Sequence, residues 1–246
     1  MLHRRNRLAV VILVLACVLL QLVPAEAAMM TAASVNKAIL SMKSEYYEGR
    51  PWTNDDFYRW KGGKYYGGKG CVAFAFIMSD AAFGSLPSRE IDPKNYDAIR
   101  VGDILRVNND THSVIVIEKY DEFVVIAEGN YNSSIHWGRA MGKQAVMNAD
   151  ECLTRYPDDR SGHDPVRSDV FTVPANHTRI EEEAFAGTDI RMLIIPSGVT
   201  AVEQNAFKDC KSLEKVYICY GADEADIDYY AFSGCDNVTR QYVKVN

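Results

Sequence analysis

The chain has 246 residues, of which 48% are hydrophobic and 24% charged. This length and apolar fraction suit one large domain or two small ones, and they exclude a disordered or fibrous protein. The formal net charge of −6 provides no attraction to nucleic acid or to anionic membrane surfaces, so neither is an expected partner.

The N-terminus has the composition of an export signal. Three arginines among the first seven residues form a basic head, residues 8–23 are almost wholly apolar, and residues 25–27 read Ala-Glu-Ala, an A-x-A cleavage site. The apolar stretch is shorter than the roughly 20 residues that a membrane-spanning helix needs. We therefore expect residues 1–27 to be a cleaved signal peptide and the protein to be secreted or held at a bacterial cell surface, with no membrane contact after cleavage. An uncleaved anchor is the alternative.

Removal of residues 1–27 leaves 24 basic and 32 acidic side chains, a net charge of −8, and five of the six cysteines. An odd number of cysteines in an exported protein leaves at least one thiol unpaired within the monomer. Cys71 is the natural candidate, because it follows a glycine-rich run and begins an apolar one. Most cysteines are simply small buried side chains, so a catalytic interpretation requires partners elsewhere in the chain.

Two helices are expected in the first part of the chain, over residues 32–47 and 71–83. The first has apolar residues on one face, and the second is rich in helix formers and is followed by Gly84, a typical helix stop. Cys71 would then lie at a helix N-terminus, where unpaired N–H groups and the helix dipole stabilise a thiolate. Between the helices lies an aromatic loop with Trp52, whose side chain could line a cleft or belong to the core.

Three strands follow, at residues 103–107, 113–119 and 123–128. The last two should form a hairpin with its turn at Tyr120-Asp121. Paired residues in a hairpin have numbers with a constant sum. A sum of 240 places His112 opposite Glu128, and a sum of 242 places it opposite Asn130. A sum of 241 would turn these side chains to opposite faces. The run 143–156 has weak helical periodicity and is expected to close the first domain.

A cysteine at a helix start, a histidine at a strand start and a carboxylate or amide across the hairpin are the groups that a thiol hydrolase needs. The imidazole helps to form the thiolate and later protonates the leaving group, while the third residue fixes the ring's tautomer and orientation. Individually, His112 and Glu128 could be ordinary surface residues. The sequence contains no Cys-x-x-Cys or HExxH motif, and no metal or organic cofactor is implied.

This first part resembles the CHAP family, the cysteine, histidine-dependent amidohydrolases and peptidases. The residues that carry the resemblance are Cys71, Gly102-Asp103-Ile104-Leu105, His112 with Val114-Ile115-Val116 after it, and Glu128-Gly129-Asn130-Tyr131. The resemblance implies an α+β, papain-like domain over residues 28–157. In it Cys71 would be the nucleophile, His112 the base, and Glu128 and Asn130 the orienting residues.

The same resemblance implies that the substrate is an amide or peptide bond, with peptidoglycan as the expected source. The sequence departs from the family pattern at two places beside the histidine. Thr111 stands where the family commonly has glycine, and Ser113 stands between His112 and the valine run.

From Val173 onward the sequence repeats itself. VPANHTRIEEEAF aligns without gaps on IPSGVTAVEQNAF, and a worn third copy ends at Phe232, so the Ala-Phe pairs are 22 and 25 residues apart. A period in the 20s is typical of a leucine-rich solenoid, in which each unit buries its apolar positions against the next. Cys210 and Cys235 each follow a repeat phenylalanine by three positions, which favours buried repeat positions over a disulfide or metal site.

Residues 194–218, IIPSGVTAVEQNAFKDCKSLEKVYI, resemble the BspA-like leucine-rich repeats of bacterial surface proteins. The resemblance extends over about residues 170–246 and implies a surface that binds a protein or other ligand. The polar, proline-containing run before it predicts a linker over residues 158–169.

These patterns together predict an exported cysteine amidase or endopeptidase with an α+β, papain-like domain and a short solenoid. The alternative is a non-catalytic adhesion or recognition protein that uses the repeats to bind its ligand. A protease acting on proteins also remains open.

Overall fold

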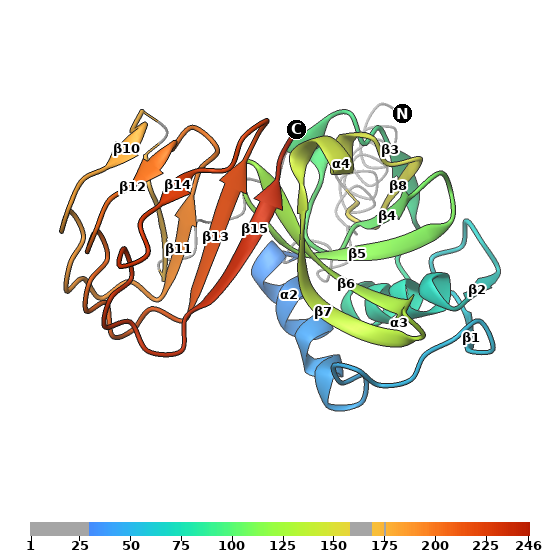
Figure 1. Ribbon diagram of the computed structural model, residues 1–246. Helices are drawn as coiled ribbons and strands as arrows, with labels where there is room; N and C mark the ends of the chain where they lie inside the picture. Colours follow the sequence, from blue (N-terminus) through green and yellow to red (C-terminus); the bar gives the residue numbers. More distant parts are fainter. Residues whose placement is uncertain (1–29, 158–168, 175) are drawn as a thin grey trace, which may run out of the picture.

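The computed structural model describes residues 30–157, 169–174 and 176–246 (Figure 1). The predicted signal peptide, residues 1–27, lies outside the described residues, as does the predicted linker except for Asp169. Within the described ranges, no helix has both the length and the apolar character needed to cross a membrane.

The N-terminal part, residues 30–157, is built on a six-stranded sheet with the order β3-β8-β4-β5-β6-β7, in which every neighbouring pair is antiparallel. In sheet order the strands are β3 Arg89–Ile91, β8 Glu151–Thr154, β4 Ile104–Val107, β5 His112–Lys119, β6 Phe123–Tyr131 and β7 Ser134–Gly142. The helices are α2 Ala32–Ser41, α3 Cys71–Phe83, α4 Lys143–Met147 and the 3-10 turns η2 Met42–Ser44 and η3 Tyr96–Ala98. A small hairpin of β1 Phe57–Arg59 and β2 Gly67–Lys69 precedes α3. This architecture agrees with the predicted α+β class, and the finer papain-like assignment stays a prediction.

Helix α2 begins at a capping box in which the Thr31 and Ser34 side chains each accept from the other's backbone N–H. It is shorter than the predicted helix over residues 32–47, because it ends at Ser41 and the chain continues as the 3-10 turn η2. The chain then turns to pack Tyr46 edge-on against Trp52 and Phe74. This aromatic contact prevails over the weak helical pattern of the segment.

Helix α3 has the predicted extent and stops at Gly84, whose φ of +58° suits glycine. The helix is apolar on all sides because it contacts α2, β1, β2 and the main sheet. Its buried Asp80 pairs with Arg155 at 2.5 Å and accepts from the Tyr58 hydroxyl at 3.0 Å. The helix that carries Cys71 is therefore held in place by apolar packing and by the polar contacts of Asp80.

The predicted hairpin is present as β5 and β6, and its turn spans Tyr120 to Phe123. Val114 pairs with Glu128, so the numbers sum to 242 near His112, one of the two predicted registers. A bulge after Val116 shifts the register, so that the pairs between the bulge and the turn sum to 243. Glu128 therefore lies diagonally across from His112 on the same face of the sheet.

The weak helical periodicity of residues 143–156 corresponds to a helix only at the start of the run. Only α4, Lys143–Met147, is helical, and residues 151–154 form β8 between β3 and β4. Cys152 and Leu153 belong to two different apolar clusters, one on each side of the sheet. Burial on both faces and pairing with two strands decide the conformation here, and neither is visible in local periodicity.

The C-terminal part winds as a β-solenoid with two parallel sheets (Figure 1). The larger sheet has the order β15-β13-β11-β9, with β9 Val170–Thr172, β11 Met192–Ile195, β13 Lys215–Tyr220 and β15 Thr239–Lys244. The smaller sheet has the order β10-β12-β14, with β10 Arg179–Ile180, β12 Ala201–Val202 and β14 Asp226–Ile227. The predicted solenoid is confirmed.

The repeat phenylalanines form a stack along the solenoid. Phe207 lies 5.3 Å from Phe185 and 5.2 Å from Phe232 between ring centroids, with nearly parallel planes. The Cys210 thiol donates to the Phe185 carbonyl at 3.2 Å, and the Cys235 thiol donates to the Phe207 carbonyl at 3.0 Å. The two cysteines occupy equivalent repeat positions. Cys210 is buried, as predicted, and Cys235 is half-buried. Every cysteine within the described ranges is a free thiol.

The solenoid packs directly on the N-terminal part. Tyr217 of β13 is buried against Phe123 of β6, with 4.7 Å between ring centroids, and one apolar cluster includes residues of both parts. The backbone N–H of Ser197 donates to Glu122 at 2.9 Å, and that of Gln144 donates to the Val245 carbonyl at 3.1 Å. Figure 1 shows β15 beside β7, so the repeats extend the first part as one continuous structure.

We expect Phe207→Ala to lower the free energy of unfolding by about 3–5 kcal/mol, because it leaves a cavity between two stacked rings. Urea denaturation followed by circular dichroism measures this loss. Tyr229→Ala is the matched control, since that residue is 86% exposed and its removal should leave stability nearly unchanged. A loss below about 1 kcal/mol for Phe207→Ala would contradict the role given to the stack.

Candidate active site

Cys71 is placed by the unusual backbone of the residue before it. Gly70 has φ +54° and ψ −123°, a conformation that only glycine adopts readily, and a Cβ there would overlap the side-chain oxygen of Asn54. The indole N–H of Trp52 donates to the Gly70 carbonyl at 2.8 Å, so Trp52 belongs to the core that supports the site. The glycine-rich run therefore fixes Cys71 as the first residue of α3.

His112 begins β5 and is oriented by a buried carboxylate. Its Nε2 lies 2.8 Å from Oε2 of Glu128, whose side chain has no exposed surface. On the other side of Glu128, Arg139 of β7 donates from Nε to Oε1 at 2.5 Å and from Nη2 to Oε2 at 2.7 Å. This bidentate contact fixes the carboxylate. Because Nε2 of His112 is occupied by Glu128, Nδ1 is the imidazole nitrogen that can face the thiol.

The neighbouring charges set the protonation of this pair. Burial raises the pKa of Glu128, but the hydrogen bonds and charges of Arg139 and His112 outweigh burial and lower it to about 2. Burial lowers the pKa of His112, but its interactions with the Cys71 thiol and with Glu128 raise it to about 9. The arrangement therefore favours an ionised carboxylate beside a protonated imidazole.

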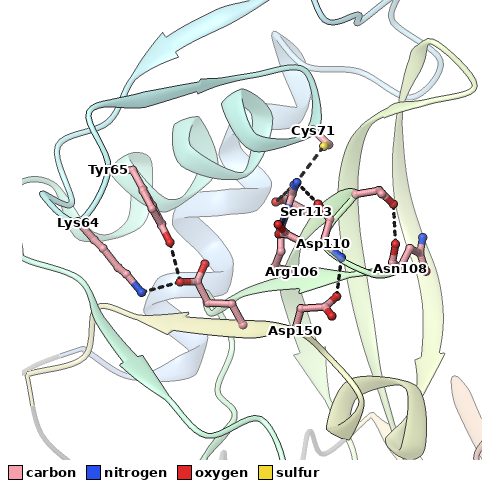
Figure 2. Close-up of polar contacts among 10 residues, drawn as sticks. Lys64, Tyr65, Cys71, Arg106, Asn108, Asp110, Ser113 and Asp150 are labelled. Carbon is pink, nitrogen blue, oxygen red and sulfur yellow. Dashed lines mark hydrogen bonds and ion pairs between the residues drawn. The ribbon is translucent and has the colours of Figure 1, made fainter.

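The Cys71 thiol lies in an electropositive position. Burial raises its pKa, but His112, the backbone N–H of Ser113 and the charge of Arg106 together lower it to about 7. Figure 2 shows Arg106 reaching toward the sulfur, with 4.0 Å between Nη1 and Sγ. A thiolate can therefore form near neutral pH and act as a nucleophile.

Asn130 is placed elsewhere than its predicted role requires. Its φ is +58°, and its side-chain Nδ2 donates to Oδ1 of Asn54 at 2.9 Å, against the backbone of Gly70. The structure thus brings Cys71, His112 and Glu128 together and directs Asn130 to the start of α3 instead of to the imidazole. The assigned roles of the four residues stay predictions.

The glycine between Glu128 and Asn130 has a packing role. A Cβ on Gly129 would lie 2.6 Å from Cβ of Phe74 and 2.8 Å from the Trp52 ring. Only glycine lets β6 approach α3 this closely, which brings the carboxylate on β6 near the helix that carries the cysteine.

Two arginines of the site were missed by sequence reasoning. Arg139 pairs with Ile126 across β6 and β7, and this pairing puts its side chain on the same face as that of Glu128. Arg106 pairs with Ser113 across β4 and β5. The register of each pair would have revealed the contact, but the sequence shows no motif around either arginine.

Comparison with known proteins identifies the repeats. Residues 167–246 match the family model described as BspA type leucine rich repeat region (6 copies). No CHAP domain is identified in the chain, and neither a curated protein nor a solved structure matches it.

We expect the rate of Cys71 alkylation by iodoacetamide to rise with a midpoint near pH 7, where the Cys71 pKa lies, instead of near 8.5 for an unperturbed thiol. Mass spectrometry of the Cys71 peptide measures the rate at each pH. His112→Ala should raise the midpoint, and the buried Cys152 provides an internal control that reacts slowly at every pH. A wild-type midpoint at 8.5 or above would contradict the electrostatics described.

Arg139→Gln should lower the free energy of unfolding at neutral pH by roughly 1–3 kcal/mol, because it leaves a buried carboxylate with one partner. The loss is below that of a fully buried pair because the Arg139 side chain is 37% exposed. The folded-state pKa of Glu128 is depressed, so this stability is present above about pH 4.5 and disappears as pH falls toward 2.

Urea denaturation of both proteins between pH 3 and 7 measures that difference. Arg191→Gln, which removes an exposed arginine paired with Glu214 on the repeats, is the control and should cost little at any pH. A loss for Arg139→Gln that is constant across this pH range would show that the arginine acts without Glu128.

Proposed function

We propose that this protein is an exported cysteine amidohydrolase or peptidase with a papain-like, CHAP-type domain and a repeat region that binds its target surface. The observations that carry the proposal are the lowered pKa of the Cys71 thiol, to which His112 contributes most, and the 2.8 Å contact of His112 with the buried Glu128. A purely structural histidine has no need of a thiol on one nitrogen and a clamped carboxylate on the other.

In the proposed reaction the Cys71 thiolate attacks an amide carbonyl carbon, and the new carbon–sulfur bond forms. His112 gives its Nδ1 proton to the amine nitrogen as the carbon–nitrogen bond breaks, which leaves a thioester on Cys71. Water then attacks the thioester carbonyl while His112 accepts a proton from it, and the carbon–sulfur bond breaks to restore the thiolate.

The start of α3 is suited to stabilise the oxyanion of this reaction. The first intrahelical bond runs from the Phe74 N–H to the Gly70 carbonyl, so the N–H groups of residues 71–73 have no partner within the helix. They point out of the helix N-terminus beside the sulfur, where negative charge would develop on the substrate oxygen. Glu128 keeps the imidazole aligned in both steps.

The substrate follows from the resemblance of the first part to CHAP domains, which points to peptidoglycan amide or peptide bonds. The repeats would hold the domain on a cell wall, a host surface or another protein. Because the solenoid packs on β6 and β7, a bound surface would keep a constant orientation relative to Cys71.

A second candidate is a recognition or adhesion protein in which the first part binds without cleaving. The repeat region is the part of the chain that matches a known family, and this match supports recognition better than catalysis. The two candidates differ in the reactivity of one thiol and in the release of products.

The test is digestion of purified bacterial peptidoglycan, with the released fragments identified by mass spectrometry. We expect new muropeptide ends from the wild type and a loss of at least about 1,000-fold for Cys71→Ala, which removes the nucleophile. Cys235→Ala is the matched control, because it removes a thiol of the solenoid and should leave the release unchanged. No release from the wild type, together with slow Cys71 alkylation at neutral pH, would favour the recognition protein.

A further inference from the structure

Arg106 lies between the proposed nucleophile and the turn that joins β4 to β5. Its Nη1 is 3.0 Å from the Ser113 hydroxyl, to which it donates, and 4.0 Å from the Cys71 sulfur (Figure 2). The side chain is 22% exposed, so most of it is enclosed by the site. A guanidinium stays charged at any pH at which proteins fold, unlike the imidazole on the other side of the sulfur.

The turn is shaped to hold this guanidinium. Asp110 accepts from Arg106 Nε at 2.7 Å, and the Asp110 backbone carbonyl accepts from Nη2. Residues 108–110 all have positive φ, between +54° and +59°, which costs about 1 kcal/mol or more for each side chain that is not glycine. The Asp110 N–H is bound in turn by Asp150 at 2.8 Å.

The basic side chains near the Cys71 sulfur lie between it and the acidic side chains that bind them. His112 and Arg106 both face Sγ. The carboxylate of Asp110 binds Nε, while a different guanidinium nitrogen, Nη1, reaches the sulfur. Glu128 lies beyond the imidazole and is itself neutralised by Arg139. The charges that act on the thiol are therefore those of two basic residues, His112 and Arg106.

We propose that Arg106 is a thiolate-binding residue, which stabilises the Cys71 sulfur anion independently of the protonation of His112. The proposal rests on the proposed thiol chemistry and adds a second cation to it. Arg106 would raise the thiolate fraction of the resting protein, and it would stabilise the sulfur as the leaving group when the thioester carbon–sulfur bond breaks.

Ser113, one of the two departures from the family pattern, fits this assignment. Its hydroxyl accepts from Arg106. Its backbone N–H helps to lower the pKa of the Cys71 thiol. Ser113 is 3% exposed and pairs with Arg106 across β4 and β5. It therefore helps to hold the guanidinium in position beside the Cys71 sulfur. A residue without a side-chain acceptor would leave Nη1 without this second contact.

The test is the pH dependence of Cys71 alkylation in variants of Arg106, measured on the purified protein by mass spectrometry of the Cys71 peptide. We expect Arg106→Gln to raise the midpoint by about one pH unit, the lower end of the effect of an opposite charge this close, because Asp110 offsets part of it. Arg106→Lys keeps the positive charge, so its alkylation midpoint should lie close to the wild-type value. Arg191→Gln removes the same charge on the repeats and should leave the midpoint at the wild-type value.

The same substitution in a protein that already carries His112→Ala separates this proposal from the proposed function. In His112→Ala, which lacks the base, Arg106→Gln should still raise the alkylation midpoint by a similar amount. Equal midpoints with and without Arg106 in both backgrounds, at unchanged melting temperature, would overturn the thiolate-binding role. An Arg106-dependent midpoint in a protein that releases no muropeptides would uphold this role and contradict peptidoglycan as the substrate.

Discussion

The proposed site depends on a carboxylate that is fully buried. Glu128 has no exposed side-chain surface, and an isolated ionised carboxylate in that position would be strongly destabilised. Arg139 and His112 each contact it within 2.8 Å and keep it charged. The same contacts keep His112 cationic and oriented, and a cationic imidazole in turn favours the Cys71 thiolate. The ionisation states of the three groups therefore depend on one another.

Backbone constraints around this cluster bring the partners within reach of each other. Gly70 has a conformation that a side chain would not tolerate, and Gly129 lets β6 lie directly against Phe74 of α3. Three successive left-handed residues turn β4 back into β5 and present Asp110 to Arg106. Backbone strain of this kind persists only where the surrounding structure holds it, which is typical of functional sites. The buried Asp80–Arg155 pair at the other side of α3 keeps the helix from shifting.

The solenoid contributes stability and position more than chemistry. Its stacked phenylalanines and inward cysteines form a core of their own, while Ile194 and Tyr217 extend the core of the first part. The contact between Glu122 and the Ser197 backbone joins the turn of the β5–β6 hairpin to the repeats. The hairpin that carries His112 and Glu128 is thus braced at its far end by the solenoid.

Local sequence patterns were sufficient for the features that depend on neighbours in the chain. The extent of α3, the β5–β6 hairpin, the proximity of His112 to Glu128 and the repeat period all follow from spacing, turn residues and apolar periodicity. Residues 151–154, Asn130 and the two arginines depend on contacts between distant segments. Strand β8 exists because β3 and β4 supply its hydrogen bonds. Asn130 turns to Asn54 because its left-handed backbone lies in the irregular stretch of β6 between the pairings of Glu128 and Tyr131 with β7. Arg106 and Arg139 become partners of Cys71 and Glu128 only through strand register, which tertiary packing decides.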